Sequence, residues 1–493
     1  MSIGVVYQVY PRSFLDTTGS GIGDLDGVTA KLDHLTWLGV DAIWLSPIHP
    51  SPGVDGGYDV ADHTDVDACF GGLPAFDRLL AAAHGRGVRV LLDWVPNHTS
   101  DRHPWFVSSR HDPAGPHGDW YWWADAPANN WPSAFGGPAW TFDPVRGQYY
   151  LHLFTPAQPD LNWNHPGVRA AMLDGLRFWL GRGVDGFRAD VVNLIGRDPA
   201  LPDAVLSDPG NLDEFVGGYR DPRTHDLLRE IRAVLDAHPG DRVLVGEVPL
   251  ADPAAVPSYV DDGQLHAAFD FSLMEAPWSA AAWRHRIAEA ERVYGPHRAP
   301  AWPLSSHDQP RHRTRHGDRE DRARVAATVL LTLRGTPFVY QGEEFGLTDA
   351  IIPPGRRRDP LGRDGSRAPV PWTAAPGHGW AGDPWLPWPP HADTRNAGAQ
   401  CADQTSILWL YRGLIALRRA HPALRDGDLT LLDCPDDVLA YRRGDALTVL
   451  ANFGDGPVPV RHRGRVLISS GAGGFADGLL APCTAVVLGP ELG

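Results

Sequence analysis

The stretch GVDGFRAD, at residues 183–190, is a largely apolar, strand-like run that ends in an acidic residue. Two later stretches have the same form, RVLVGE at residues 242–247 and WPLSSHD at residues 302–308. Each predicts a buried parallel strand that is followed at once by a loop, with Asp190, Glu247 or Asp308 at its C-terminal end. Because the C-terminal ends of barrel strands meet at one mouth, three such ends predict three carboxyl groups around one ligand.

Strand-like and helix-like segments alternate along most of the chain, which is typical of βα units in a parallel sheet. Helix-like segments occupy residues 28–39, 75–87, 168–183 and 406–424. Eight strand candidates are present, the number that closes a (β/α)8 barrel. They lie at residues 5–10, 41–46, 88–94, 185–190, 243–247, 267–271, 302–308 and 338–344. The sequence therefore predicts an α/β fold of the TIM-barrel type.

Two regions depart from this alternation. Residues 99–166 are rich in Trp, Pro, Asn and Gly and are too long for a simple loop, so they predict a subdomain inserted after the third strand. From about residue 429 onward, short strands separated by turns predict a small all-β domain. The predicted organisation is a barrel formed by residues 1–98 and 167–425, an inserted subdomain at 99–166, and a C-terminal β-sandwich-like domain at 426–493.

Three carboxyl groups at one mouth have a specific chemical use. Crowded carboxylates repel one another, so one tends to hold its proton while another stays ionised. Cleavage of a glycosidic bond needs such a pair, a nucleophile and a proton donor. The alternative is that these acids are ordinary strand-end or helix-capping residues. The 19 tryptophans, several of them beside polar residues, favour a carbohydrate ligand, although most are explained as core aromatics.

The composition limits the partners. The formal net charge of −16 argues against nucleic acid and anionic membranes as partners. The four cysteines are widely spaced, without a CxxC pair, so neither a disulfide framework nor a zinc site is expected. No apolar stretch approaches the roughly 20 residues that span a bilayer. The segment MSIGVVYQVYPRSF lacks the features of a signal peptide, so we expect a cytoplasmic protein.

Ten segments together carry a resemblance to a known family. The chain resembles the α-amylase superfamily of glycoside hydrolases (family 13), and within it the α-glucosidase and oligo-1,6-glucosidase branch. The resemblance runs essentially from end to end. The segments are YQVYPRSF (7–14), GVDAIWLSPIHPSP (39–52), GGYDVADHTDVD (56–67), DWVPNHTS (93–100), QPDLNW (158–163), GVDGFRAD (183–190), VGE (245–247), SSHDQPR (305–311), YQGEEFGL (340–347) and RDGSRAPVPW (363–372).

The resemblance implies a retaining α-glucosidase that releases terminal non-reducing glucose from short α-glucosides. It implies Asp190 as the nucleophile, Glu247 as the general acid and base, and Asp308 as the stabiliser of the oxocarbenium-like transition state. Retention requires the carboxyl groups of Asp190 and Glu247 to lie about 5–5.5 Å apart. From the residues themselves, Arg188 lies two positions before Asp190 on a strand, so it should face Asp190 and keep it ionised. The apolar residues before Glu247 predict an apolar setting that raises the pKa of its carboxyl group.

The resemblance also implies the residues that hold the sugar. His98 and His307 should bind its hydroxyl groups, and Tyr58 and Asp59 should stack on and anchor the non-reducing end. In the resembled branch an arginine pairs with that aspartate; Arg363 is the candidate here, with Arg367 as an alternative. An anchored terminal sugar implies exo-attack. Val191, which follows the predicted nucleophile, favours α-1,6-linked or mixed substrates.

The segment from residue 16 to residue 24 resembles the small metal loop of this branch. No cofactor is needed for the chemistry, but a structural Ca²⁺ or Mg²⁺ could bind there. The usual pattern has Asn and Asp where this chain has Thr18 and Ser20, which weakens the site, and a metal-free glycine turn is the alternative. The candidate ligands are Asp16, Thr18, Ser20, the Ile22 carbonyl and Asp24.

Two further departures are Ser306, where the branch commonly has asparagine, and His63, where tyrosine is usual. Neither removes a carboxyl group. Three functions stay open: an α-glucosidase, a transglucosylase or sucrose or trehalose isomerase on the same scaffold, and a non-catalytic binding relative. The partner is a small α-glucoside in the first two. The oligomeric state, monomer or dimer, also stays open.

Overall fold

A computed structural model describes residues 3–205, 219–260 and 262–490 of the chain. These residues divide into two compact parts. The first part consists of Met1–Ile43, Ala82–Val88 and Asp270–Gly493, and the second part of Trp44–Ala81 and Arg89–Phe269.

The central feature of the fold is one eight-stranded sheet of the barrel type. Its strand order is β10-β11-β1-β2-β3-β7-β8-β9. The pairs whose register is known are parallel: β1 with β11, β10 with β11, β3 with β7, β7 with β8, and β8 with β9. The strands are β1 (Val6–Val9), β2 (Ala42–Leu45), β3 (Arg89–Trp94), β7 (Gly186–Ala189), β8 (Val243–Gly246), β9 (Ala267–Ala268), β10 (Ala301–Pro303) and β11 (Thr336–Tyr340). The eight predicted strands and the barrel are confirmed.

The strands are buried on both faces, which explains their apolar sequences. Every residue of β1, β2, β7 and β8 is buried. Helices cover parallel barrel strands on the outside and layers of side chains fill the inside, so neither face reaches water. Arg188 in β7 and Asp93 in β3 are buried charged residues within these apolar strands.

Helices follow the strands at the predicted places. The predicted helix at 28–39 is two short helices, α1 and α2, which meet at Lys31. α1 begins earlier than predicted because the Asp24 carboxylate accepts a hydrogen bond from the Gly27 N–H at its first turn. The α-helices are α1 (Leu25–Ala30), α2 (Leu32–Leu38), α3 (Gly72–His84), α4 (Pro104–His111), α5 (Pro166–Arg182), α7 (Arg223–Asp236), α8 (Ser272–Glu275), α9 (Ala280–Tyr294), α10 (His312–Arg315), α11 (Glu320–Thr332), α12 (Ala397–Ala402), α13 (Ile407–Ala420) and α14 (Pro422–Arg425).

The chain between β3 and α5 forms the predicted insertion, within the second part. It contains α4 and a three-stranded antiparallel sheet in the order β4-β6-β5. The strands are β4 (Trp123–Ala124), β5 (Trp140–Asp143) and β6 (Gln148–Leu151). Its core contains Trp122, Trp131 and Trp140, together with Val191 and Leu194 from the segment after β7. Many of the tryptophans of this region are therefore core residues, as the alternative interpretation held.

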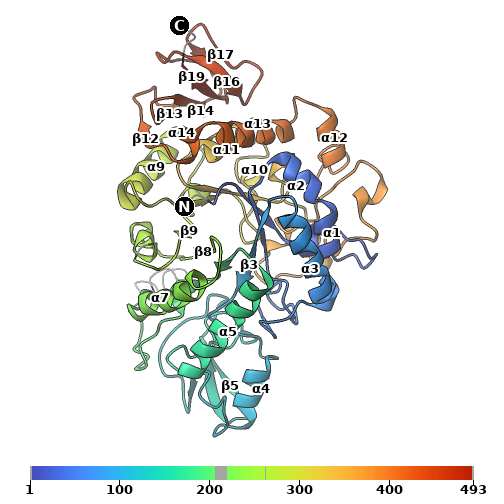
Figure 1. Cartoon of the computed structure of the whole chain (residues 1–493), viewed down its shortest axis with the longest axis vertical. Coiled ribbons are helices and arrows are strands. Elements are labelled where there is room, and N and C mark those ends of the chain that lie inside the picture. Colours follow the sequence, from blue (N-terminus) through green and yellow to red (C-terminus); the bar gives the residue numbers. More distant parts are fainter. Residues whose placement is uncertain (1–2, 206–218, 261, 491–493) are drawn as a thin grey trace. The chain divides into compact units, whose positions relative to one another are not determined.

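The C-terminal region is all-β, as predicted. A five-stranded sheet has the order β12-β13-β14-β19-β16, and a three-stranded sheet has the order β15-β18-β17. Within the first part, β13 contacts α9, and β14 and β19 contact α11 (Figure 1). The strands are β12 (Leu429–Leu431), β13 (Val438–Arg443), β14 (Leu447–Asn452), β15 (Val458–Pro459), β16 (Arg465–Ser469), β17 (Phe475–Ala476), β18 (Leu479–Leu480) and β19 (Ala485–Gly489). The boundaries predicted between the three domains stay predictions.

Among the described residues, no helix is long and apolar enough to cross a membrane. All four cysteines are free in the structure, with Cys69 and Cys401 exposed and Cys483 buried.

Candidate active site

Asp190 and Arg188 come from the end of β7 in the second part. The backbone N–H of Asp190 donates to the carbonyl of Trp94, at the end of the neighbouring strand β3. Arg188 Nη1 lies 2.6 Å from Asp190 Oδ1, so the two side chains face each other as predicted. The Arg188 side chain is only 2% exposed. A buried guanidinium at this distance stabilises the ionised form of Asp190.

Glu247 follows β8 directly and contacts the same guanidinium. Its N–H donates to the carbonyl of Ala189, which aligns the ends of β7 and β8. Its Oε2 lies 2.5 Å from Arg188 Nη2. The predicted apolar setting of this carboxyl group is therefore wrong. The apolar side chains before Glu247 belong to β8, whereas the carboxyl group extends beyond the strand and meets a cation.

Asp93, near the end of β3, is the third acid at this guanidinium, and the sequence interpretation missed it. Arg188 Nη1 lies 2.9 Å from Asp93 Oδ1. The hydroxyl of Tyr58 and the indole N–H of Trp44 donate to Asp93 Oδ2, at 2.8 and 3.2 Å. Burial raises the pKa of Asp93 to about 6 despite the opposing effect of Arg188. A lone acid inside the apolar stretch VRVLLDWV is the sequence signal that could have revealed it.

The aromatic rings of Trp44 and Tyr58 complete the surroundings of Arg188. Its guanidinium carbon lies 5.1 Å from the ring centroid of Trp44 and 5.6 Å from that of Tyr58. These cation–π contacts hold the guanidinium in one orientation. The Tyr58 ring thus lies at the cluster of acids, where a stacked sugar would need it.

Val191 has an unusual backbone. Its φ of 34° and ψ of 43° are left-handed, a conformation that is rare for a β-branched residue. Its N–H donates to Glu247 Oε2 at 3.3 Å, and its side chain packs in the core of the insertion. These contacts offset the strain and link the residue after Asp190 to the carboxyl group of Glu247.

His98 lies in a buried polar chain of the second part. Its Nε2 is 3.1 Å from the amide nitrogen of Gln158 and 3.2 Å from the carbonyl oxygen of Tyr58. The same amide of Gln158 donates to Asp55 Oδ2 at 3.0 Å. Burial lowers the pKa of His98 to about 3, so its ring is neutral at ordinary pH. Gln158 and Asp55 were not predicted as site residues, although both lie in quoted or adjacent stretches.

Asp59 is enclosed by its own turn. Its carboxylate accepts hydrogen bonds from the Ser51 hydroxyl and from the N–H groups of Val54 and Asp55. The residue is 0% exposed. These contacts give Asp59 a role in shaping the turn at 51–59, and its predicted role as sugar anchor stays a prediction.

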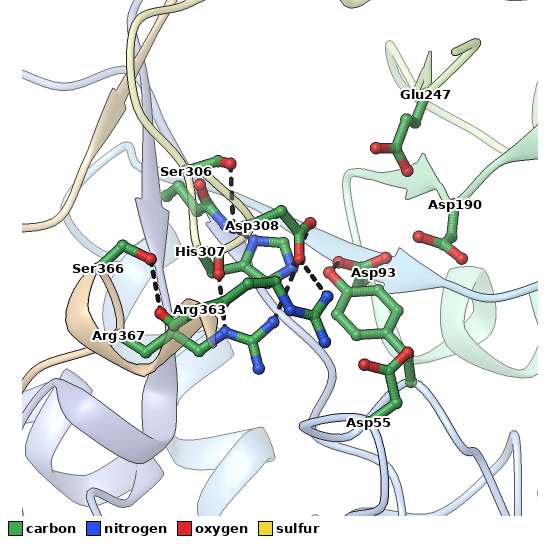
Figure 2. A network of polar contacts seen from close by, with 12 residues as sticks. Asp55, Asp93, Asp190, Glu247, Ser306, His307, Asp308, Arg363, Ser366 and Arg367 are labelled. Atoms are coloured by element: carbon green, nitrogen blue, oxygen red, sulfur yellow. Dashed lines mark hydrogen bonds and ion pairs between the residues drawn. The ribbon is translucent and has the colours of Figure 1, made fainter. Parts of the chain in front are cut away.

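Asp308 belongs to the first part, five residues after the end of β10. Its Oδ1 lies 2.8 Å from Arg363 Nη1 and 3.2 Å from Arg367 Nη2 (Figure 2). The Asp308 N–H donates to the Ser306 hydroxyl at 3.1 Å, so Ser306 shapes this loop. The Asp308 side chain is 31% exposed, whereas the Arg367 side chain behind it is 2% exposed. Both candidate arginines therefore hold Asp308, and the pairing of Arg363 with Asp59 stays a prediction.

His307 is fixed from both sides. Its Nδ1 lies 2.8 Å from the amide nitrogen of Gln8 on β1, and its ring stacks on Tyr10 with centroids 5.8 Å apart. Its Nε2 is 3.1 Å from Asp308 Oδ2, and its carbonyl accepts from Arg367 Nε (Figure 2). Both ring nitrogens of His307 therefore face polar groups of the protein, Gln8 on one side and Asp308 on the other.

Comparison with known proteins decides the family. Residues 8–427 match the model of the alpha-amylase catalytic domain. The chain belongs to the alpha-amylase family. Residues 425–488 match a domain of unknown function, DUF3459, which corresponds to the C-terminal β region. The resemblance inferred from the ten motifs is confirmed, and the chain is a glycoside hydrolase.

Relatives within the alpha-amylase family are similar over nearly the whole chain. A probable alpha-glucosidase of Rhizobium meliloti (strain 1021) is 41% identical over 479 residues, covering 89% of this chain and 86% of the relative. An oligo-1,6-glucosidase of Parageobacillus thermoglucosidasius is 37% identical over 510 residues, covering 92% and 90%. The solved structure of trehalulose synthase MutB from Pseudomonas mesoacidophila MX-45 has a TM-score of 0.93 at 35% identity, covering 99% of this chain and 98% of that one.

In the candidate metal loop of this alpha-amylase family member, the oxygen atoms of the predicted ligands already form hydrogen bonds within the protein. Asp16 accepts from the N–H groups of Thr18, Gly19 and Gly21. Asp24 accepts from Thr17 and from the Gly27 N–H. The Ser20 hydroxyl donates to the carbonyl of Ile22, so two of the predicted ligands bind each other. With two carboxylates, both already bonded, the donor set does not fit a tightly held Ca²⁺ or Mg²⁺.

Proposed function

We propose that this protein is an exo-acting, retaining α-glucosidase. It hydrolyses terminal non-reducing α-linked glucose from short oligosaccharides or α-glucosides through a covalent glycosyl-enzyme. Asp190 is the nucleophile, Glu247 the general acid and then the general base, and Asp308 the acid that stabilises the developing positive charge. The relatives named alpha-glucosidase and oligo-1,6-glucosidase support this function.

One observation carries the proposal: a single buried guanidinium, that of Arg188, joins Asp190 and Glu247. Two carboxyl groups on neighbouring nitrogens of one guanidinium lie close together. This arrangement favours the short separation of retaining enzymes, about 5–5.5 Å, over the wider one that leaves room for a water.

The charges around Arg188 suit both steps of the reaction. Three acids share one cation, and burial raises the pKa of one of them, Asp93, to about 6. Glu247 donates a proton to the leaving oxygen while Asp190 attacks the anomeric carbon. Once Asp190 is an ester it has lost its charge. Arg188 then favours an ionised Glu247, which is the base that the hydrolysis of the ester needs.

Asp308 fits the third role by its position and its surroundings. Like Asp190 and Glu247, it follows the C-terminal end of a strand of the parallel barrel, where active sites of this fold lie. It is the more exposed member of its cluster with Arg363 and Arg367, so one carboxyl oxygen can reach a sugar.

For the terminal sugar, we propose that Tyr58, His98 and His307 provide stacking and hydrogen bonds. We assign the anchoring acid to Asp55 rather than Asp59, because the Asp59 carboxylate is used by its turn. The amide of Gln158 contacts both Asp55 and His98, so the three residues form one polar chain.

The linkage preference is proposed to lean toward α-1,6 bonds. Val191 follows the nucleophile and its conformation is fixed by Glu247 and by the core of the insertion. A rigid β-branched side chain next to the cleaved bond contributes about 1–3 kcal/mol of discrimination, which biases the preference without making it absolute.

A transglucosylase or a sucrose or trehalose isomerase is the second candidate. The similarity to trehalulose synthase MutB favours it, because the two chains share the fold at 35% identity. All three carboxyl roles are the same in both functions. The difference is whether water or a sugar hydroxyl attacks the Asp190 ester.

One experiment tests both candidates. Maltose, isomaltose, sucrose and trehalose are incubated separately with the enzyme, at low and high substrate concentration, and the products are resolved by chromatography. The hydrolase predicts two free glucose molecules per bond cleaved in maltose, isomaltose and trehalose, and one glucose with one fructose in sucrose, fastest with isomaltose. New disaccharides in place of free glucose would establish the transferase. The cytoplasmic location, the absence of nucleic acid and membrane partners, and the oligomeric state stay predictions from the sequence.

A further inference from the structure

Asp359 lies in the first part, behind the two arginines that hold Asp308, and no motif of the sequence pointed to it. Its side chain is 3% exposed, against 31% for Asp308. Arg363 turns its Nε and Nη2 toward Asp359, with Nη2 2.6 Å from Oδ1 and Nε 3.1 Å from both oxygens. This leaves Nη1 of Arg363 for Asp308.

Arg367 likewise contacts both Asp359 and Asp308 through different nitrogens of its guanidinium group. Its Nη1 lies 3.4 Å from Asp359 Oδ1, its Nη2 lies 3.2 Å from Asp308 Oδ1, and its Nε donates to the carbonyl of His307. The two guanidinium groups therefore lie between two carboxylates, one buried and one presented outward. The Arg363 N–H also donates to Asp359 Oδ2 at 2.8 Å, so the buried acid orients the backbone as well as the side chains.

The charge balance explains why a second acid matters. Without Asp359, the positive charge of the two guanidinium groups next to Asp308 would be less compensated, and their field would weaken the effect of Asp308 on a positively charged transition state. Asp359 adds the compensating negative charge at a buried place where its interactions are weakly screened. Burial acts to raise the pKa of Asp359, but contacts with Arg363 and Arg367 prevail and lower it, which keeps this charge in place.

We propose that Asp359 is a positioning residue for the reaction: it holds Arg363 and Arg367 and balances their charge, so that Asp308 keeps the negative potential that stabilises the oxocarbenium-like transition state. This inference rests on the proposed function. It assigns to a residue that meets no substrate a share of the electrostatic stabilisation.

The neighbouring Asp364 offers a matched control. It is also buried and acidic, and it lies a few residues further along the chain, in the short 3-10 helix η7 (Arg363–Gly365). Its carboxylate accepts from the backbone N–H groups of Arg358 and Asp359, not from the two guanidinium groups. Asp364→Asn therefore weakens the loop without removing the charge next to the arginines.

The test compares wild type, Asp359→Asn, Asp364→Asn and Asp308→Asn. Calorimetric binding of a protonated imino-sugar and of neutral glucose is measured, together with kcat, KM and Tm. Asp359→Asn is expected to weaken imino-sugar binding on the order of tenfold while glucose binding changes little, because one compensating charge is lost. It should also lower kcat with little change in KM, since the lost interaction acts in the transition state.

The outcomes separate the two levels of the proposal. If Asp359→Asn binds both ligands as wild type does, or weakens both equally with a fall in Tm like that of Asp364→Asn, Asp359 is only a part of the loop and the inference is overturned. If wild type releases no glucose from α-glucosides, or Asp308→Asn keeps full activity, the proposed function itself fails.

Discussion

The guanidinium of Arg188 faces three acids, and their geometry decides how protons are shared at the site. Asp190, Glu247 and Asp93 all lie within 3 Å of its nitrogens. Asp93 is the most enclosed, with its carboxylate also bonded to Tyr58 and Trp44, and its pKa is raised to about 6 by burial. We therefore expect Asp93 to take up a proton at a higher pH than an ordinary aspartate does, while Asp190 and Glu247 meet the sugar.

Glu247→Gln tests the proton donor. The amide cannot donate a proton to a leaving oxygen, so hydrolysis of maltose or isomaltose should fall by about three orders of magnitude or more. A nitrophenyl or fluoride leaving group needs little protonation, so its release should be largely preserved. Pre-steady-state release of nitrophenol against steady-state release of glucose measures this difference. An equal loss on all these substrates would remove Glu247 from the role of acid.

Variants of Asp55 and Asp59 distinguish a residue that anchors the terminal sugar from one that stabilises the fold. Asp55→Ala should lower kcat/KM at least about tenfold on every α-glucoside, because a hydroxyl of the terminal sugar loses its acceptor. Asp59→Ala should instead lower the free energy of unfolding by about 2 kcal/mol, because three donors, one of them on the buried residue Asp55, lose their partner. Kinetics and thermal unfolding of both variants measure the contrast. Loss of activity at unchanged Tm in Asp59→Ala would return the anchoring role to Asp59.

At the scale of elements, the loop before α1 determines whether the fold uses a metal. The oxygens of Asp16 and Asp24 are bonded to N–H groups and to Thr17 or Thr18, and Asp24 also caps α1. Burial acts to raise the pKa of Asp16, but hydrogen bonds from Gly21, Thr18 and Gly19 prevail and lower it. These donors thus stabilise the ionised carboxylate, as a bound cation would.

Addition of EDTA should therefore leave Tm and activity unchanged. The fold binds no ion at the loop under this account, so a chelator has nothing to remove. Differential scanning calorimetry with EDTA and with added Ca²⁺ measures this directly. A Tm that falls with EDTA and recovers with Ca²⁺ would show that the hydroxyl groups of Thr18 and Ser20 ligate a metal after all.

The strands were predictable from the sequence, but their ends were not. Each of the eight is a short apolar run bounded by loop residues, a pattern that buried parallel strands require. The predicted strand at 302–308 ends at Pro303 instead, because proline lacks an N–H for the ladder. Beyond it, the hydroxyl groups of Ser305 and Ser306 accept from the N–H groups of His312 and Asp308 and shape a loop.

The candidate site was predictable where chemistry follows a strand end, as at Asp190 and Glu247. The missed residues act through partners that are distant in the sequence. Asp93 meets Arg188 only when β3 and β7 pair, and Gln158 meets Asp55 only when the insertion folds. Asp359 lies in RRRDPLGRDGSR, where nothing in the sequence distinguishes it from a surface charge.

At the scale of the whole molecule, buried histidines set the response to acid. Burial lowers the pKa of His49 and His63, and lowers that of His98 to about 3 and that of His103 to about 4. In the unfolded chain these histidines have a pKa of about 6.5, so the unfolded state takes up protons first as pH falls. The stability from these groups is therefore complete above pH 6.5 and is lost as pH falls. Each histidine that stays neutral in the folded state lowers the free energy of unfolding by about 2 kcal/mol at pH 5.

His63→Phe should make the fold less sensitive to acid. Neither ring nitrogen of His63 has a hydrogen-bond partner among the described residues, so phenylalanine loses no hydrogen bond. The fall in Tm between pH 7.5 and 5 should be smaller than in wild type. The exposed His111 provides the control, since His111→Phe should leave the pH dependence as it is. The raised pKa of Asp93 has the opposite effect on the change of stability with pH, but it is the same in all three proteins. The difference between their Tm curves therefore reports on His63 alone. Parallel curves for His63→Phe and wild type would show that His63 is protonated in the folded state.

The claim that Asp190 forms a covalent bond with glucose can be measured directly. A 5-fluoro-α-glucosyl fluoride reacts with a retaining enzyme to give a slowly hydrolysed ester, which mass spectrometry of proteolytic peptides locates. The account predicts one fluoroglucosyl group per chain, on the peptide that contains Asp190, and its absence in Asp190→Asn. A label on another residue, or no label together with release of the inverted anomer, would contradict it.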